Sequence, residues 1–278
     1  MVALVAELEE IAELLRGRRV AVLSGAGIST DSGIPDYRGE GTRARTRSPI
    51  QFRQFIDDAS HRQRYWARST VGWPRFRDTR ANTAHRALAK LEESGAITGL
   101  ITQNVDRLHH DAGSKRIVEL HGALAEVRCL GCQTIVHRDA YQERLLDANP
   151  GWATATAAPA PDGDADLEDP RIANFSVPPC ESCDGILKPN VVFFGESVPR
   201  EVVAAAWALY EESDILLVVG SSLAVYSGYR FVRRATQDGK PTVLINIGES
   251  RGDDEATIRW SAPLGETLPT LASVLLAG

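Results

Sequence analysis

VAVLSGAGIST, residues 20–30, decides the fold class of this chain. Its apolar half is typical of a strand buried on both faces, and Gly25 and Gly27 permit a tight turn from that strand into a helix. Similar apolar runs follow at residues 97–102, 117–120, 215–219 and 243–247, and helical patterns lie among them at 82–94, with Asn82 as N-cap, 200–212 and 229–238. This alternation predicts a doubly wound parallel sheet, an α/β fold of the Rossmann-like type.

Two segments interrupt the alternation of strands and helices. Residues 43–80 are rich in arginine and aromatic residues and predict helices, whereas residues 123–189 contain every cysteine of the chain. Within the second segment, residues 159–170 carry five acidic residues and few apolar ones, which predicts an exposed loop. We expect a large sheet domain that comprises residues 1–42, 81–122 and 190–278, and a small domain that comprises residues 43–80 and 123–189.

The composition excludes several classes of protein. A net charge of −6 has the wrong sign for a protein that binds nucleic acid through its phosphates. No apolar run approaches the length of about 18 residues that a membrane span needs. Residues 3–16 predict an amphipathic helix rather than a secretion signal or a transit peptide, which indicates a cytoplasmic protein. The arginines between residues 38 and 47 fit either a solvated loop or a basic loop that faces a small phosphorylated ligand.

The cysteines form two C-x-x-C pairs, Cys129–Cys132 and Cys180–Cys183, with 47 residues between the pairs. Two such pairs can place four thiolates tetrahedrally around Zn²⁺, and a zinc ion with four thiolate ligands has no open position for catalysis. We therefore predict one structural zinc ion per chain, with two redox dithiols as the weaker alternative. Because residues 123–189 hold few apolar residues, the zinc ion is expected to replace a hydrophobic core in this module.

Two polar clusters directly follow predicted strands, at the edge where open α/β sheets bind ligands. In the first, QNVD at residues 103–106, amide and carboxylate groups can fix a polar ligand such as a carboxamide, although Asn104 or Asp106 could instead N-cap the next helix. The second cluster contains His121. Histidine titrates near neutral pH and is the commonest general base, but a structural histidine is an equal alternative. The histidine pair at residues 109 and 110 is expected to face solvent.

Glycine-containing turns also lie at strand ends. Gly25-Ala26-Gly27 lets backbone N–H groups approach a pyrophosphate, but residue 30 is threonine and no acidic residue ends a second strand, so a hydride-transferring dehydrogenase is disfavoured. The next segment, residues 31–39, is broken by glycine and proline, as in a loop that closes over a ligand or in a plain surface loop. Gly220-Ser221-Ser222 and Asn246-Ile247-Gly248 could contact a ribose and an adenine, or could be ordinary strand endings.

Together, these segments resemble the sirtuins, the Sir2 family of NAD-dependent protein deacylases, and the resemblance covers nearly the whole chain. The matching segments are GAGISTDSGIPDYRG (25–39), TQNVDRLH (102–109), ELHG (119–122), the two cysteine pairs, LKPNVVFFGE (187–196), GSSLAVYSG (220–228) and NIG (246–248). Within the family, the chain resembles the class II branch and its fourth human member, a mitochondrial enzyme. This resemblance is found at residues 62–76, 160–164 and 220–231.

The resemblance implies that NAD⁺ binds between the two domains and is consumed as a co-substrate. His121 would be the general base, and Asn104 and Asp106 would hold the nicotinamide carboxamide during catalysis. The reaction would remove an acyl group from lysine and release nicotinamide and O-acyl-ADP-ribose. The implied NAD⁺ ligands are Gly25, Ala26, Gly27, Ile34, Asp36, Tyr37, Arg38, Gln103, Asn104, Asp106, Gly220, Ser221, Ser222, Asn246, Ile247 and Gly248.

The resemblance also implies an acyl-lysine protein or peptide that adds a strand between the domains, and a monomeric enzyme. Long or branched acyl groups are favoured, although Tyr65 and Arg68 on one predicted helix could recognise an acidic acyl group. Phe194 is expected in the core. The alternatives are a protein mono-ADP-ribosyltransferase and a catalytically silent NAD-binding module. The implied peptide contacts are Val191, Phe193, Gly195, Glu196, Val225 and Tyr226.

Overall fold

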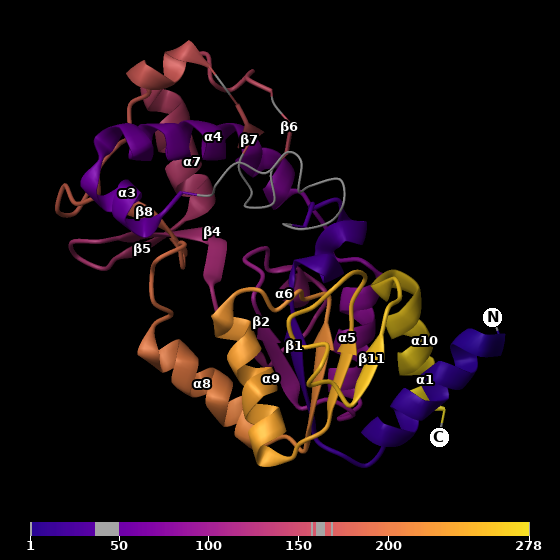
Figure 1. Ribbon diagram of the computed structural model, residues 1–278. Helices are drawn as coiled ribbons and strands as arrows, with labels where there is room; N and C mark the ends of the chain where they lie inside the picture. Colours follow the sequence, from indigo (N-terminus) through magenta and orange to yellow (C-terminus); the bar gives the residue numbers. More distant parts are fainter. Residues whose placement is uncertain (1, 37–49, 157, 160–164, 168, 278) are drawn as a thin grey trace.

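The computed structural model describes residues 2–36, 50–156, 158–159, 165–167 and 169–277. Its larger part is built on a six-stranded sheet in the order β11-β10-β9-β1-β2-β3, and every neighbouring pair of strands is parallel. The predicted doubly wound parallel sheet is therefore confirmed (Figure 1). The strands are β1 (Val20–Ser24), β2 (Gly99–Thr102), β3 (Ile117–Glu119), β9 (Ile215–Val219), β10 (Thr242–Ile245) and β11 (Ile258–Trp260).

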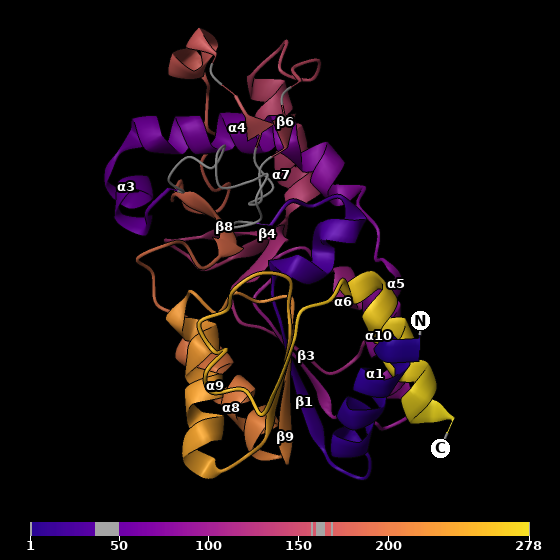
Figure 2. The same ribbon diagram turned by 45° about the vertical axis from the view of Figure 1, so that its right-hand side comes forward.

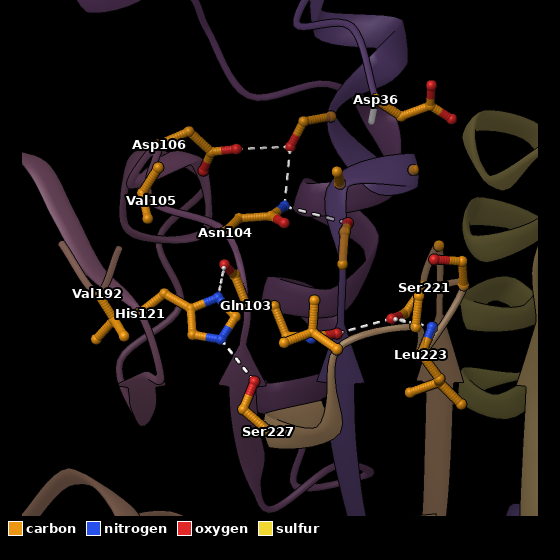
Figure 3. Close-up of a pocket in the computed structure, with 18 of the residues that line it drawn as sticks. Asp36, Gln103, Asn104, Val105, Asp106, His121, Val192, Ser221, Leu223 and Ser227 are labelled. Carbon is orange, nitrogen blue, oxygen red and sulfur yellow. Dashed lines mark hydrogen bonds between the residues drawn. The ribbon is translucent and has the colours of Figure 1, made fainter. Parts of the chain in front are cut away.

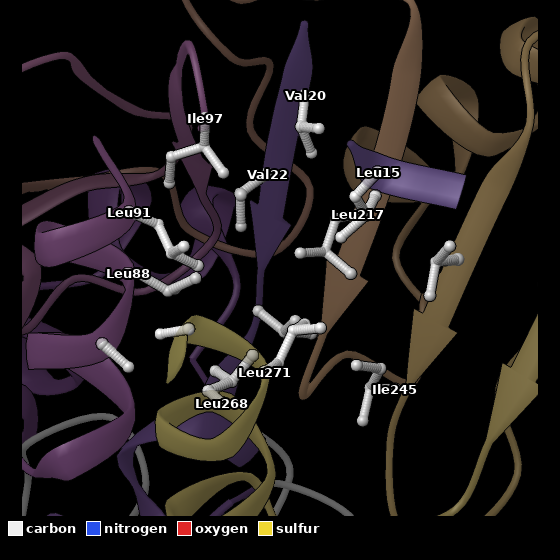
Figure 4. Close-up of a cluster of buried hydrophobic side chains, with 14 of the residues drawn as sticks. Leu15, Val20, Val22, Leu88, Leu91, Ile97, Leu217, Ile245, Leu268 and Leu271 are labelled. Carbon is white, nitrogen blue, oxygen red and sulfur yellow. The ribbon is translucent and has the colours of Figure 1, made fainter. Parts of the chain in front are cut away.

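Helices cover both faces of this sheet (Figures 1 and 2). One face packs against α1 (Val2–Leu15), α5 (Thr83–Glu93) and α10 (Leu264–Leu276), and the other packs against α8 (Arg200–Glu211) and α9 (Tyr226–Asp238). Successive side chains of a strand point to opposite faces. Val20 and Val22 therefore lie in the core beneath α5 and α10 (Figure 4), whereas Ala21 and Leu23 lie in the core beneath α8 and α9.

Several boundaries differ from the sequence prediction, and two of these differences have a clear physical reason. Helix α9 begins at Tyr226 rather than at residue 229, so Gly228 lies inside its first turn. A Cβ on Gly228 would lie 2.6 Å from the side-chain amide of Gln103, so glycine allows α9 to approach the loop after β2. Strand β10 ends at Ile245 rather than at residue 247. The side chain of Asn246 donates to the next two carbonyl groups, which turns the chain there.

A smaller antiparallel sheet of three strands, in the order β5-β4-β8, lies beyond the carboxyl ends of the large sheet (Figures 1 and 2). Its strands are β4 (Gly122–Cys129), β5 (Ile135–His137) and β8 (Leu187–Val191). The helices beside it are α3 (Phe52–Asp57), α4 (Ala59–Arg77) and α7 (Arg138–Ala148). Within the described residues, the segment predicted as helical thus contributes α3 and α4.

The small sheet has an apolar core, which corrects the expectation that zinc replaces one. Trp66 of α4 is fully buried, its ring centroid lies 4.8 Å from that of Tyr141 on α7, and its Nε1 donates to the Leu187 carbonyl. Phe55 and Phe175 are also fully buried in this cluster. Most buried members of this cluster, among them Val127, Leu145 and Leu187, come from residues 123–189 themselves, so the sequence prediction underestimated the apolar content of this segment. Helices α3 and α4 complete the core.

The remaining elements are short. The insert predicted as an exposed loop lies only partly within the described residues, and there β6 pairs with β7. Across the described ranges, no helix combines the length and the apolar character that crossing a bilayer requires. These elements are η1 (Ala26–Ser32), α6 (Leu108–Asp111), β6 (Ala158–Pro159), β7 (Ala165–Asp166) and η2 (Pro170–Asn174).

Asn82 caps α5, as predicted, and also anchors the turn after β1. Its Oδ1 accepts from the N–H groups of Ala84 and His85, and its Nδ2 donates to the Ile28 carbonyl at 2.7 Å. We expect Asn82→Ala to lower the free energy of unfolding by about 2 kcal/mol, because a helix cap and a buried hydrogen bond are lost together. Urea denaturation measures this change. Asn82→Asp keeps the cap acceptor and should lose less, and a loss below about 0.5 kcal/mol for the alanine variant would contradict this role.

Candidate active site and metal centre

A cleft with a volume of ≈ 1820 Å³ lies between the carboxyl edge of the large sheet and the segment that follows β8. The loops after β1, β2, β9 and β10 form one wall. Every predicted NAD⁺ ligand that the structure describes lines this cleft, and so do His121 and the six predicted peptide contacts. Tyr37 and Arg38 lie outside the described residues. Residues from segments far apart in the sequence thus meet in one cleft.

The turn after β1 packs against the turn after β9 without space for side chains. A Cβ on Gly27 would lie 2.9 Å from the backbone of Gly220, and one on Gly25 would lie 2.8 Å from the Gly220 carbonyl oxygen. The N–H of Gly25 donates to the Val219 carbonyl at 3.1 Å, and that of Gly27 donates to the Gly220 carbonyl at 2.8 Å. The N–H groups of Gly25 and Gly27 are therefore bonded within the protein, and the approach of other N–H groups of this turn to a pyrophosphate stays a prediction. The two glycines allow close packing of the loops.

Gly27→Ala should weaken NAD⁺ binding at least about tenfold, because the added methyl group pushes the two turns apart; this is about 1.4 kcal/mol of binding free energy. Isothermal titration calorimetry measures the affinity, and circular dichroism checks the fold. Gly95→Asn is a matched control, since no atom lies within 4 Å of its Cβ position and asparagine tolerates its φ of +79°. Unchanged affinity in the Gly27 variant would show that this close approach is not needed for binding.

Asn104, Asp106 and Ser29 form one buried hydrogen-bond network (Figure 3). Asn104 Nδ2 donates to the Gly25 carbonyl at 3.2 Å and to Ser29 Oγ at 3.1 Å, and Ser29 Oγ donates to Asp106 Oδ2 at 2.7 Å. Asp106 Oδ1 also accepts from the Leu108 N–H at 2.9 Å, so the carboxylate binds the first N–H group of α6 as well as facing the cleft. Burial raises the pKa of Asp106, and its hydrogen bonds from Leu108 and Ser29 oppose that shift. The network holds an amide and a carboxyl group rigidly beside the cleft.

His121 has both ring nitrogens held by hydrogen bonds. Its Nδ1 lies 2.8 Å from the Gln103 carbonyl oxygen, and its Nε2 lies 2.8 Å from Ser227 Oγ (Figure 3). A carbonyl only accepts, so Nδ1 carries the proton and Nε2 is the acceptor. Burial lowers the pKa of His121, the hydrogen bond to Gln103 opposes this shift, and the charge of Arg230 adds to it. The ring is therefore neutral near pH 7 and has the tautomer of a base.

His109 is buried, which corrects the expectation that it faces solvent. Its Nε2 lies 2.8 Å from Ser24 Oγ, and its ring centroid lies 4.9 Å from that of His85. Burial lowers its pKa well below the usual range for histidine. His110 does reach solvent, with 45% of its side chain exposed. The short helix α6 therefore places one histidine of the pair beneath the site and the other at the surface.

The segment after β8 forms the wall opposite the glycine turns. Phe193 is 8% exposed and packs edge-on against Phe55 and Tyr65, whereas Phe194 is 42% exposed. The expectation that Phe194 lies in the core is therefore wrong. The buried ammonium group of Lys188 pairs with Glu196 at 2.9 Å, and Glu196 also accepts from the Phe193 N–H at 2.9 Å. These contacts fix the backbone of the wall.

Ser29, Val192, Ser227 and Arg230 line the cleft but were missed by the sequence analysis. Val192 donates its N–H to the His121 carbonyl at 2.9 Å, and Ser29 connects Asn104 with Asp106. Small polar and apolar residues in turns have no distinctive spacing. Only their position within the segments that carry the other site residues could have indicated them.

The four cysteines lie together at the far end of the small sheet. All four Sγ atoms lie within 4.8 Å of one another, with Cys129–Cys183 at 3.5 Å and Cys132–Cys180 at 3.7 Å. A tetrahedral Zn²⁺ with bonds of about 2.3 Å separates its sulfur ligands by roughly 3.8 Å, so this donor set fits zinc. A Cβ on Gly185 would lie 2.9 Å from Cys129 Sγ, so the loop fits closely around the thiolates. The group has no open position for chemistry.

The fold and the site define an α/β protein that has a ligand cleft at the carboxyl edge of its parallel sheet and a separate four-cysteine metal-binding group. The Sir2 family model matches residues 25–227, and the chain belongs to that family. It is 52% identical over 256 residues to the "NAD-dependent protein deacetylase" of Xanthomonas axonopodis pv. citri (strain 306), a match that covers 92% of this chain and 87% of the relative. It is 51% identical over 275 residues to the "NAD-dependent protein deacetylase 1" of Mycobacterium avium (strain 104), with coverage of 97% and 96%.

Solved structures agree with this assignment. A structure described as "Sir2-p53 peptide-NAD+" has a TM-score of 0.79 and 30% identity, and the match covers 98% of this chain and 99% of the other. Another, described as "Sir2 bound to acetylated peptide", has a TM-score of 0.75 and 30% identity, with coverage of 96% and 97%. The match extends over the whole architecture, including both sheets.

Proposed function

We propose that this chain is an NAD-dependent protein lysine deacylase that releases nicotinamide and O-acyl-ADP-ribose. The observation that carries the proposal is the meeting in one cleft of a neutral histidine, His121, with the rigid pair Asn104 and Asp106. The relatives are named as NAD-dependent protein deacetylases, and a related structure holds a peptide and NAD⁺. Both facts support the same reaction for this chain.

NAD⁺, when bound, supplies an anomeric carbon that accepts the acyl oxygen as nicotinamide departs. Asn104 donates its amide N–H groups to the protein, so its Oδ1 is available to the carboxamide of nicotinamide. His121 takes a proton from a ribose hydroxyl on its Nε2 side, and the Gln103 carbonyl stabilises the imidazolium through Nδ1–H. Ser221 and Asn246, at the ends of β9 and β10, hold the adenosine half of the ligand.

The acyl-lysine peptide binds as a strand between residues 191–196 and residues 225–226. Val225 and Tyr226 are 39% and 53% exposed, so they offer apolar surface to such a strand. Tyr65 and Phe193 line the cleft side by side, whereas Arg68 is not among its lining residues. This wall supports long or branched apolar acyl groups over acidic ones.

Deacylation should increase from acid to neutral pH with an apparent pKa below about 6.5, the ordinary value for histidine. Burial and the charge of Arg230 lower the pKa of His121, more than the Gln103 hydrogen bond raises it. A general base must be unprotonated, so activity is lost as the pH falls through this pKa and is complete above it. The pH profile of kcat/KM measures it. Arg230→Gln should move the acid limb to higher pH, and an acid limb centred above about 7 in the unchanged enzyme would contradict the assignment.

The remaining proposals about this enzyme are supported by its sequence alone. They are membership of the class II branch with resemblance to the fourth human sirtuin, the division into two domains, a cytoplasmic location, a monomeric state and no binding of nucleic acid. The net charge of −6 supports the last of these. Size-exclusion chromatography with light scattering tests the monomeric state directly.

A panel of acyl-lysine peptides incubated with NAD⁺ and read by mass spectrometry tests the function. The panel contains acetyl, octanoyl, branched, lipoyl, biotinyl and succinyl lysine in one peptide sequence. Deacylation gives equal amounts of free lysine peptide, nicotinamide and O-acyl-ADP-ribose. ADP-ribose retained on protein, without O-acyl-ADP-ribose, would instead identify a mono-ADP-ribosyltransferase. Binding of NAD⁺ without turnover of any peptide would identify a silent binding module.

A further inference from the structure

Ser227 is hydrogen-bonded to Nε2 of His121, the one ring nitrogen of the base that can accept a proton. Because Nδ1 of His121 donates to the Gln103 carbonyl, the neutral ring has one lone pair, on Nε2. Ser227 Oγ lies 2.8 Å from this nitrogen and must be the donor (Figure 3). A substrate hydroxyl that approached Nε2 directly would therefore have to displace the serine.

The position of Ser227 is fixed by packing. The residue lies in the first turn of α9, where its carbonyl accepts from Arg230 Nε at 3.0 Å. The neighbouring Gly228 lies against the side chain of Gln103, and Gln103 Oε1 accepts from Ser221 Oγ at 2.7 Å. The two hydrogen-bond partners of His121 thus belong to elements that contact each other directly. The serine is part of the same rigid unit as the base.

The oxygen of Ser227 can also accept a hydrogen bond from a substrate. Both Ser227 and His121 line the cleft, so the hydroxyl group is available to a ligand. A serine oxygen donates one hydrogen bond and has two lone pairs that accept. Among the described residues, Ser227 Oγ makes no hydrogen bond other than the one to His121. Its lone pairs are therefore free for a substrate hydroxyl, and hydrogen bonds in such a chain strengthen one another.

We propose that Ser227 is a catalytic residue that relays a proton from the substrate hydroxyl to His121. The Oγ–H bond of Ser227 breaks as its proton passes to Nε2, and the proton of the substrate hydroxyl takes its place on Oγ. Serine ends as it began, His121 becomes a cation, and the substrate oxygen keeps the electron pair with which it attacks. The inference rests on the proposed deacylase function and adds a residue to it.

Two reactions of the intact enzyme separate a relay from a structural role. Exchange of labelled nicotinamide into NAD⁺, in the presence of an acetyl-lysine peptide, requires binding and departure of nicotinamide but not the later proton transfer. Formation of O-acyl-ADP-ribose requires both. Ser227→Ala should lower product formation at least about tenfold and leave exchange within about twofold of the unchanged enzyme. Ser227→Thr keeps a hydroxyl group and should restore most of the product formation.

Thr236→Val is the matched control, since it removes a hydroxyl group from the same helix without changing the shape of the side chain. Thr236 Oγ1 donates only to the Val232 carbonyl within α9, so both reactions should stay unchanged. A second measurement follows product formation in mixtures of H₂O and D₂O. The relay moves two protons, so the rate should depend quadratically on deuterium content in the unchanged enzyme and linearly in Ser227→Ala.

Equal product formation by Ser227→Ala and the unchanged enzyme would overturn the relay, and faster formation would show that the serine only blocks the base. An equal loss of exchange and product formation, without rescue by threonine, would also overturn it, because that pattern indicates impaired binding. A linear dependence on deuterium in the unchanged enzyme would do the same. If the unchanged enzyme shows neither exchange nor product with any acyl peptide, the proposed function itself fails, whatever the serine does.

Discussion

Replacing His121 with alanine should lower kcat/KM for deacylation about 10³-fold while the fold stays intact. A positioned general base contributes about 10²- to 10⁴-fold in rate, and the two hydrogen bonds of 2.8 Å already hold this ring in the basic tautomer. Affinity for NAD⁺ should stay within about threefold, because the turns after β1 and β9 do not depend on the imidazole. Steady-state kinetics on an acetyl-lysine peptide and calorimetry with NAD⁺ measure the two quantities separately.

His61→Ala is the control for this variant. His61 lies on α4 with 41% of its side chain exposed, and pairs only with Asp58 at the start of that helix. Its loss should leave kcat/KM within about twofold, as for a surface substitution. A His121→Ala enzyme that kept more than about a tenth of the original kcat/KM would show that the proton leaves by another route.

Cys180→Ser should release the zinc ion and lower the melting temperature by about 10 °C. Zinc binding to four ligands contributes about 10–16 kcal/mol in isolated zinc-finger peptides, but here the apolar core around Trp66 and Tyr141 stabilises the small sheet as well. A net loss of about 4 kcal/mol in the free energy of unfolding lowers the melting temperature by roughly 2–4 °C per kcal/mol, which gives a decrease of about 10 °C. Elemental analysis should find about one zinc per chain before the substitution and about none after it.

Gln133→Gly is the control, in the turn that carries the other cysteine pair, Cys129 and Cys132. Gln133 has a φ of 63°, a left-handed conformation that glycine adopts without strain, and it supplies no thiolate. The variant should keep both its zinc and its melting temperature. A chelator applied to the unchanged protein should reproduce the effect of Cys180→Ser. Retention of full stability by the metal-free protein would refute a structural role for the ion.

The fold was predictable from sequence because its core follows a local rule. Residues 20–23 must all be apolar when a strand is covered on both faces, and the same pattern marks the other buried strands of the sheet. Element boundaries were less predictable because they depend on contacts from elsewhere in the chain. Helix α9 begins three residues earlier than predicted and includes Gly228, which packs against Gln103 after a different strand.

The individual roles of polar and aromatic residues were harder to predict. An extended segment points neighbouring side chains to opposite sides, so one of Phe193 and Phe194 had to be exposed, but the sequence alone does not say which one. Helix α6 is too short for a hydrophobic period to distinguish His109 from His110. Ser227 was missed because its partner, His121, lies 106 positions away along the chain. Such pairs become visible only when the fold brings them together.

His121 also lies where the chain crosses between the two sheets. Strand β4 begins at the next residue, Gly122, and β8 ends at Val191, whose neighbour Val192 bonds to the His121 carbonyl. Two of the connections between the sheets therefore meet at the base. The backbone that joins the two sheets is thus the same backbone that positions the imidazole beside the cleft.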